Sequence, residues 1–247
     1  RFDDRTFERY EKGLLTLINT QSPLKEQLLK GYEAPPQTQP TYPWLQLNPS
    51  QRQAAQLAMN ADYLALIHGP PGTGKTHTAI ALAKENIALG NNVWLLADSN
   101  AACDHLTRSA RQNGIHALRL GSQYRIAKDV LPYSLHQGIL NHPQQKVIAL
   151  IRKQLRMGSQ DANSLYKELR ATKRSIRQQV LSAADVITCT LGSLGRYVSK
   201  LKACDIAIID EATQAISPAI LSVVPAIKKC VLIGDPRQLG PTVLQPN

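Results

Sequence analysis

The sequence is poor in the features that mark disulfide-rich, zinc-binding and membrane proteins. It has four cysteines, Cys103, Cys189, Cys204 and Cys230, and no two of them form a C-x-x-C pair. This scatter argues against a zinc site or a disulfide framework and favours a reducing setting. The charged N-terminus, RFDDRTFERYEKG, has no apolar segment typical of a secretory signal, and no apolar run approaches membrane-spanning length. We therefore expect an intracellular protein, cytoplasmic or nuclear.

Acidic residues are also scarce, with 18 Asp and Glu against 29 Lys and Arg and a formal net charge of +11. Residues 146–180 contain nine basic residues and only two acidic ones. Like charges gathered in this way repel one another unless a polyanion neutralises them, so nucleic acid is the first candidate partner and an anionic membrane surface the second. For any single residue, a solvated charged face is an equally good explanation.

Three of the 14 glycines lie in one stretch, YLALIHGPPGTGKT at residues 63–76, which fits the phosphate-loop pattern G-x-x-x-x-G-K-[ST]. The apolar residues 63–67 predict a buried strand, and residues 77–89 predict a helix that stops at Gly90. In that order, backbone N–H groups and the helix N-terminus can surround an oligophosphate. A chance match to the pattern is expected about one time in a hundred in a chain of this length. The predicted nucleotide contacts are Gly69, Pro70, Pro71, Gly72, Thr73, Gly74, Lys75, Thr76 and His77.

An acidic pair follows a second apolar run, DIAII at residues 205–209. Asp210 is expected to hold Mg²⁺ opposite Thr76, and Glu211 to polarise an attacking water as general base. The alternative is that both are acids favoured at a helix N-terminus. Gln238, in GDPRQ after the apolar residues 231–233, is placed to sense a γ-phosphate or to orient water. The predicted catalytic residues are thus Lys75, Asp210, Glu211 and Gln238.

Apolar runs alternate with helical stretches along most of the chain, which predicts an α/β fold with a mostly parallel sheet and helices on both faces. Expected strands lie at residues 63–67, 93–97, 116–120, 185–189, 205–209 and 231–233. We expect a helical segment at 1–33, a proline-rich linker at 34–46 and the main domain at 47–247. A basic helical hairpin is expected as an insertion at about 121–180, broken near residues 157–159.

Two further signals are weak when taken alone. Gln51, in the first turn of a helix predicted within residues 47–59, could grip an adenine edge or could simply be solvated. Ser99 or Asn100, after the strand at 93–97, could touch a phosphate or cap the next helix.

Together these strings resemble a known family. LNPSQ, GPPGTGKT, ADSNAACDHL, VITCT, DEATQA and GDPRQLGPTV look like motifs Q, I, Ia, Ib, II and III of superfamily 1 helicases. The similarity is strongest to the 5′-to-3′ group that contains the nonsense-mediated-decay RNA helicase and the immunoglobulin-mu-binding helicase. The resemblance implies a RecA-like P-loop NTPase domain that binds ATP and Mg²⁺ through Gln51, residues 72–76, Asp210, Glu211 and Gln238.

The resemblance also implies partners. Single-stranded nucleic acid, RNA or DNA, would contact the chain near Ser99, Asn100, Thr188 and Thr190, and no membrane partner is expected. The basic hairpin matches the family's helical insertion, where we predict contacts from Arg152, Lys153, Arg174 and Arg177. Residues 1–33 resemble the helical stalk that joins a small β-barrel to this domain, so a β-barrel and a second RecA-like domain are expected in the full-length protein.

The chain departs from the family pattern at two positions. Asp98 stands where proline is usual, which places an acid near the expected nucleic-acid track, and Ala212 replaces a common serine. Motifs IV to VI are not within these 247 residues, so the chain alone is expected to be nearly inactive as an ATPase. The alternative function is a basic nucleic-acid- or protein-binding module whose nucleotide site is vestigial or regulatory. Another class of P-loop ATPase is disfavoured, because GDPRQLGP has no obvious role outside helicases of this type.

Overall fold

The apolar runs form one parallel β-sheet. The computed structural model describes residues 4–31, 44, 46–158, 161–238 and 240–241. The sheet has six strands in the order β1-β6-β5-β2-β4-β3, and every neighbouring pair is parallel. The strands are β1 (Leu64–His68), β2 (Val93–Ala97), β3 (Ala117–Arg119), β4 (Val186–Thr190), β5 (Cys204–Ile209) and β6 (Ile227–Gly234).

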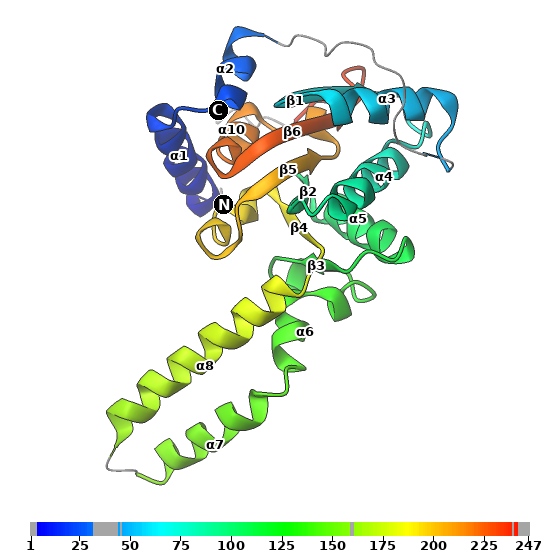
Figure 1. The fold of residues 1–247 in the computed structure, drawn as a ribbon. Helices are drawn as coiled ribbons and strands as arrows, with labels where there is room; N and C mark the ends of the chain where they lie inside the picture. The colour runs from blue at the N-terminus through cyan, green and yellow to red at the C-terminus, as the bar shows by residue number, and fades with distance from the viewer. Residues whose placement is uncertain (1–3, 32–43, 45, 159–160, 239, 242–247) are drawn as a thin grey trace, which may run out of the picture.

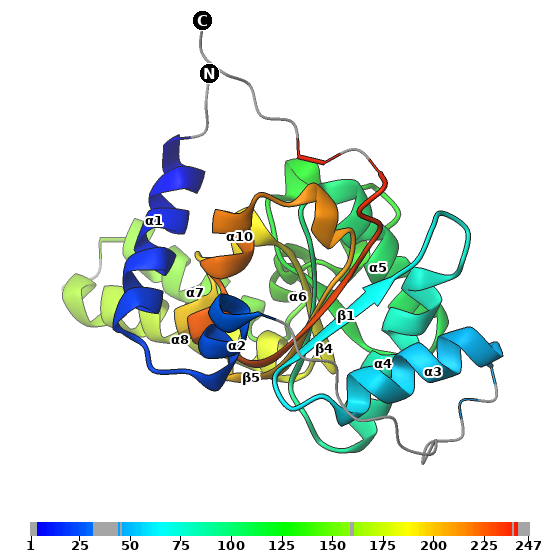
Figure 2. The ribbon, with the colours of Figure 1, turned by 90° about the horizontal axis from the view of Figure 1, so that it is seen from above.

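Both faces of the sheet are covered by helices, because both sets of alternating side chains are apolar. On β2, Val93, Leu95 and Ala97 face one core, whereas Trp94 and Leu96 face the other. The first core is closed by α3 (Pro49–Asn60), α4 (Lys75–Ala88) and α5 (Asn100–Gln112), and the second by α1 (Asp4–Asn19), α2 (Pro23–Lys30), α9 (Leu191–Leu194) and α10 (Ser217–Leu221) (Figure 2). This confirms the predicted α/β, RecA-like class.

The N-terminal helices belong to the second layer. Tyr10, Leu17 and Leu24 are buried in the same core as the strands. Ser22 accepts a hydrogen bond from the Lys25 N–H and thereby caps α2. The linker predicted at 34–46 lies outside the described residues, apart from residues 44 and 46.

Three helices are inserted between β3 and β4, namely α6 (Leu135–Leu140), α7 (Gln145–Arg156) and α8 (Ala162–Ser182). Helices α7 and α8 extend away from the sheet as a pair (Figure 1), with a small core of Ile148, Ile151, Leu169 and Ile176. At the base of the pair, a Cβ on Gly138 would lie 2.7 Å from Cγ1 of Val180, so α6 approaches α8 closely. Neither α8 nor any other described helix is apolar enough over sufficient length to cross a membrane.

Several boundaries differ from the predicted ones by one residue, and two elements, α4 and β6, begin at least two residues earlier than predicted. Helix α4 begins at Lys75 rather than at residue 77, because Gly74 adopts a left-handed conformation (φ +79°) that turns the loop directly into the helix. Strand β6 begins at Ile227 rather than at residue 231. Lys228 breaks the apolar run, but its Nζ donates to Asp205 Oδ1 of the neighbouring strand at 2.8 Å.

Candidate nucleotide and nucleic-acid sites

The phosphate loop joins β1 to α4 in the conformation that the glycine pattern requires. Gly72 and Gly74 have φ angles of +77° and +79°, which side-chain-bearing residues rarely adopt. A Cβ on Gly69 would lie 2.7 Å from Thr73 Oγ1, and one on Gly74 would lie 2.4 Å from Gln51 Nε2. These glycines therefore allow both the turn and the close approach of neighbouring side chains.

The loop meets the acidic pair across the sheet. Strands β1, β6 and β5 are adjacent, so their carboxyl ends share one edge. There the Thr76 hydroxyl donates to Asp210 Oδ2 at 2.9 Å, although the two residues are 134 positions apart. Lys75 is buried, and its Nζ donates a long hydrogen bond, 3.3 Å, to the Pro70 carbonyl within the loop.

Glu211 is held in a strained conformation. Its φ of +52° is the single positive value among the described residues other than glycine, and such strain gathers at functional sites. The Glu211 N–H donates to Asp210 Oδ1 at 3.0 Å, and Glu211 Oε2 accepts from Gln214 Nε2 at 3.2 Å. The backbone and Gln214 together fix where this carboxylate points.

Gln238 is held by a residue that the sequence reasoning did not select. Asp235 is buried, and its Oδ2 accepts from Gln238 Nε2 at 3.2 Å. Its Oδ1 accepts from the Arg237 N–H at 3.0 Å and lies 3.3 Å from His68 Nε2. These contacts lower the pKa of Asp235, the bond from the Arg237 N–H most of all. Its place in GDPRQ, three residues before Gln238, was the available signal.

Eight of the predicted residues line a common cleft of about 520 Å³, whereas Gln51, Gly69, Pro70, Thr73 and Asp210 are not among its lining residues. Lys75, Thr76, Glu211 and Gln238 line it together with Pro71, Gly72, Gly74 and His77. Three residues of α5 that were not predicted also line it, namely His105, Ser109 and Gln112, together with Asn113 directly after that helix. The cleft therefore combines a basic group, an acidic group and a phosphate loop at one edge of the sheet.

Gln51 sits beside the loop but already has partners. Its Nε2 donates to the Thr73 carbonyl at 2.8 Å, and its Oε1 accepts from the Asn48 N–H at 3.0 Å as part of a capping box. A primary amide has two N–H donors and two lone pairs, so one of each is left over. Any adenine contact from Gln51 would use these remaining positions.

Three of the residues predicted to contact nucleic acid, Ser99, Asn100 and Thr190, lie at a second part of the same edge, where β2 and β4 end. The register pairs Ala97 with Thr190, which brings residues 99 and 100 close to the end of β4. Ser99 caps α5 by accepting from the Ala102 N–H at 3.1 Å. Asp98 lies beside them at the surface, where partial loss of solvation raises the pKa of its carboxyl.

The structure corrects the prediction for Thr188. This residue is fully buried in the middle of the sheet, and its Oγ1 lies 2.7 Å from Thr107 Oγ1 of α5. Its side chain joins a strand to a helix and does not reach the surface. Thr190, at the end of β4, is 6% exposed and lies at the edge itself.

The hairpin presents its basic residues to solvent. Arg152 and Lys153 on α7, and Arg174 and Arg177 on α8, are all exposed. None of the four forms an ion pair within the described residues. Their positive charge is therefore available to a polyanion.

Comparison with known proteins agrees with the resemblance. The protein family described as "AAA domain" matches residues 46–156 and 150–246. The relatives include DNA polymerase alpha-associated DNA helicase A of Schizosaccharomyces pombe, 30% identical over 80% of this chain and 32% of its own length. They also include DNA-binding protein SMUBP-2 of Rattus norvegicus, 32% identical over 98% of this chain and 27% of its own length. Regulator of nonsense transcripts 1 of Caenorhabditis elegans is 34% identical over 97% of this chain and 24% of its own length.

Because the family match spans nearly all of the main domain, the chain belongs to this family, within the group of superfamily 1 helicases that its motifs resemble. The chain corresponds to about a quarter to a third of the length of these relatives.

Proposed function

We propose that this chain is the ATP-binding first motor domain of an ATP-dependent helicase or translocase that acts on single strands of RNA or DNA. The observation that supports it best is the 2.9 Å contact between Thr76 of the phosphate loop and Asp210 after β5, beside a cleft lined by Lys75, Glu211 and Gln238. Membership of a helicase family supports the coarser part of the proposal.

The donor set fits Mg²⁺. A hydroxyl and a carboxylate side by side are hard oxygen ligands, and Mg²⁺ prefers one or two such ligands together with phosphate oxygens and water. Thr76 and Asp210 would hold the ion. When bound, Mg²⁺ supplies positive charge that offsets the charge developing on the transferred phosphoryl group.

The remaining residues have separate roles around the triphosphate. Lys75 would exchange its long bond to the Pro70 carbonyl for the outer phosphates, with which its positive charge interacts more strongly. Glu211, fixed by Gln214, would accept a proton from the attacking water. Gln238, which is hydrogen-bonded to Asp235, would contact the γ-phosphate.

The nucleotide site is tested by replacing Lys75. Lys75→Ala should weaken binding of ADP or a non-hydrolysable ATP analogue with Mg²⁺ at least tenfold by calorimetry, because a buried charge-assisted contact is lost. Lys84→Ala is the matched control, since Lys84 is exposed on the same helix and is not among the residues that line the cleft. Equal affinities for the wild-type chain and Lys75→Ala would contradict the assignment.

A vestigial or regulatory nucleotide site on a basic binding module is the second candidate, supported by the unpaired cations of the hairpin. The two candidates differ in one measurement on the complete protein. A motor should hydrolyse ATP faster when single-stranded RNA or DNA is added, whereas a binding module should not respond.

A further inference from the structure

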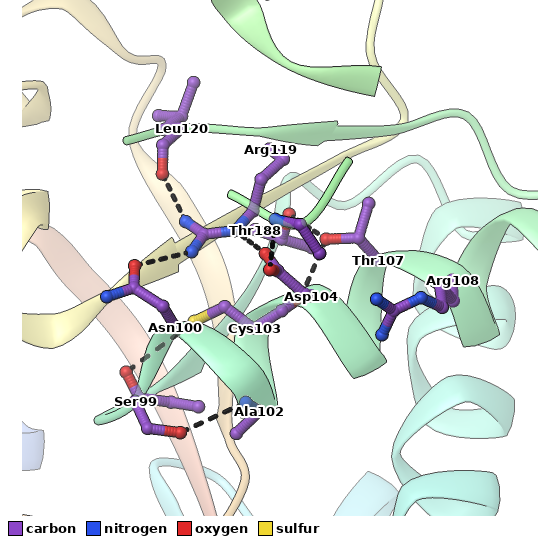
Figure 3. A network of polar contacts seen from close by, with 12 residues as sticks. Ser99, Asn100, Ala102, Cys103, Asp104, Thr107, Arg108, Arg119, Leu120 and Thr188 are labelled. Carbon is purple, nitrogen blue, oxygen red and sulfur yellow. Dashed lines mark hydrogen bonds and ion pairs between the residues drawn. The ribbon is translucent and has the colours of Figure 1, made fainter. Parts of the chain in front are cut away.

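A buried arginine lies between the edge residue Asn100 and the start of the hairpin insertion. Arg119, the last residue of β3, has no exposed surface, and its three guanidinium nitrogens all donate hydrogen bonds (Figure 3). Nε donates to Asp104 Oδ1 at 2.9 Å, Nη2 donates to Asn100 Oδ1 at 3.0 Å, and Nη1 donates to the Leu120 carbonyl. Asn100 and Asp104 both belong to α5, so this side chain of β3 holds the first turns of that helix.

The ion pair between Arg119 and Asp104 connects these hydrogen bonds to the inserted segment between β3 and β4. Asp104 is buried, and its second oxygen accepts from the Ala127 N–H at 2.8 Å, in the segment that leads to α6. Removing two charges from water is costly, and apolar residues of similar size often replace a buried pair without loss of stability. Fold stability alone therefore does not explain an arginine here.

The chemistry of the guanidinium group determines how Asn100 is oriented. Arginine offers only donors, so Asn100 has to turn its amide oxygen toward Arg119. Its Nδ2 group then faces away from Arg119 (Figure 3). No residue in the described part of the chain accepts a hydrogen bond from Nδ2. Two N–H donors are therefore held outward at the first residue of α5.

Phosphodiester oxygens are acceptors only, so outward donors at this edge match the backbone of a nucleic-acid strand. We propose that Arg119 is a positioning residue for single-strand binding: it holds the Asn100 amide so that Nδ2 donates to a strand phosphate. This proposal rests on the proposed function, because it requires the strand to pass the carboxyl ends of β2 and β4. Beyond the proposed function, it assigns a part in nucleic-acid binding to Arg119, a buried residue that does not itself touch the nucleic acid.

The first test changes Asn100 alone. Asn100→Asp keeps an oxygen for Arg119 but replaces the outward donors with a carboxylate oxygen that repels phosphate. Affinity of the full chain for a labelled single-stranded oligonucleotide, measured by anisotropy, should fall about tenfold or more, and further than with Asn100→Ala. Wild-type affinity in Asn100→Asp would overturn the proposal.

The second test asks whether Arg119 acts through Asn100. Arg119→Lys should weaken strand binding several-fold in the wild-type background and have no further effect in Asn100→Ala, since a shared interaction makes the two losses non-additive. A purely structural role would give the same loss in both backgrounds and would overturn the proposal. Nucleotide affinity should stay unchanged in every variant.

The matched control is Arg108→Lys. Arg108 lies on α5, like Asn100, and pairs with Asp129, so this variant makes the same replacement in another arginine–aspartate pair but leaves Asn100 untouched. It should change strand affinity less than twofold, and a loss equal to that of Arg119→Lys would overturn the proposal.

Two failures can be told apart. If the wild-type chain binds no single strand at all, the single-strand part of the proposed function fails and this inference fails with it. If the wild-type chain binds and Asn100→Asp binds equally well, this inference alone fails. If Arg119→Lys does not fold, Asn100→Asp decides the question, because it preserves the acceptor for Arg119.

Discussion

At the scale of single residues, Lys229 links the sheet to the helix that carries Gln51. Its Nζ donates to the Met59 carbonyl near the C-terminus of α3 at 2.9 Å. At the other end of that helix, Gln51 donates to the phosphate loop. Helix α3 is thus fastened at both ends. Burial lowers the pKa of Lys229 to about 8, although Asp62 partly offsets this effect.

This pKa predicts a pH dependence of stability. Between about pH 8 and pH 10.5, the unfolded chain keeps a proton on Lys229 that the folded chain has released, so the free energy of unfolding should rise with pH. The neutral amine can still donate to the Met59 carbonyl. Denaturant unfolding across this range should show the rise, and Lys229→Met should remove that part of it. An identical pH profile in the variant would show that Lys229 does not carry the effect.

At the scale of elements, the α7–α8 hairpin has an apolar face where its two helices pack together and a basic face exposed to solvent. A small apolar core holds the two helices together, while the basic side chains point to solvent. Packing of four core residues does not depend on the charges, so the charges can be changed without unfolding the pair. The electrostatic contribution of the hairpin to nucleic-acid binding can therefore be tested by mutation without loss of its fold.

Charge reversal on the hairpin should flatten the salt dependence of strand binding. Each lost phosphate contact removes about 0.7 from the slope of log affinity against log salt, because fewer counterions are released. We expect Arg152→Glu with Arg174→Glu to weaken binding and reduce the slope, as measured by anisotropy titrations at several salt concentrations. Lys84→Glu with Lys202→Glu, at two exposed positions outside the hairpin, is the control. An unchanged slope in the hairpin variant would indicate a solvated face or a protein-docking surface.

At the scale of the whole molecule, the nucleotide cleft opens at one edge of a single domain. Under the proposed function, an arginine of a second RecA-like domain would complete this cleft, and such an arginine is typically worth about 10³–10⁵ in rate. The 247-residue chain alone should therefore bind ADP or ATP with Mg²⁺ but hydrolyse ATP very slowly in a phosphate-release assay. Robust turnover by the purified chain would contradict this prediction.

The sequence predicts those parts of the molecule that depend on local pattern. Buried strands such as β2 follow from five consecutive apolar residues, and the meeting of Thr76 with Asp210 follows because each comes just after such a strand. The start of β6 was missed because Lys228 is neutralised by a partner on another strand. The contacts of Asp235 with Gln238 and of Arg119 with Asp104 could not be predicted for a similar reason, since only the folded chain brings these residues together.

The close approach of Gly138 to Val180 sets how the hairpin leans from the domain. Helix α8 has 21 residues and is therefore about 30 Å long, and its contact with α6 lies near the end that joins the sheet. A difference of about 5° in the angle at this contact would correspond to a displacement of roughly 2.5 Å at the far end, given that length. The packing of Gly138 on Val180 therefore determines where the exposed cations at the far end of the hairpin lie.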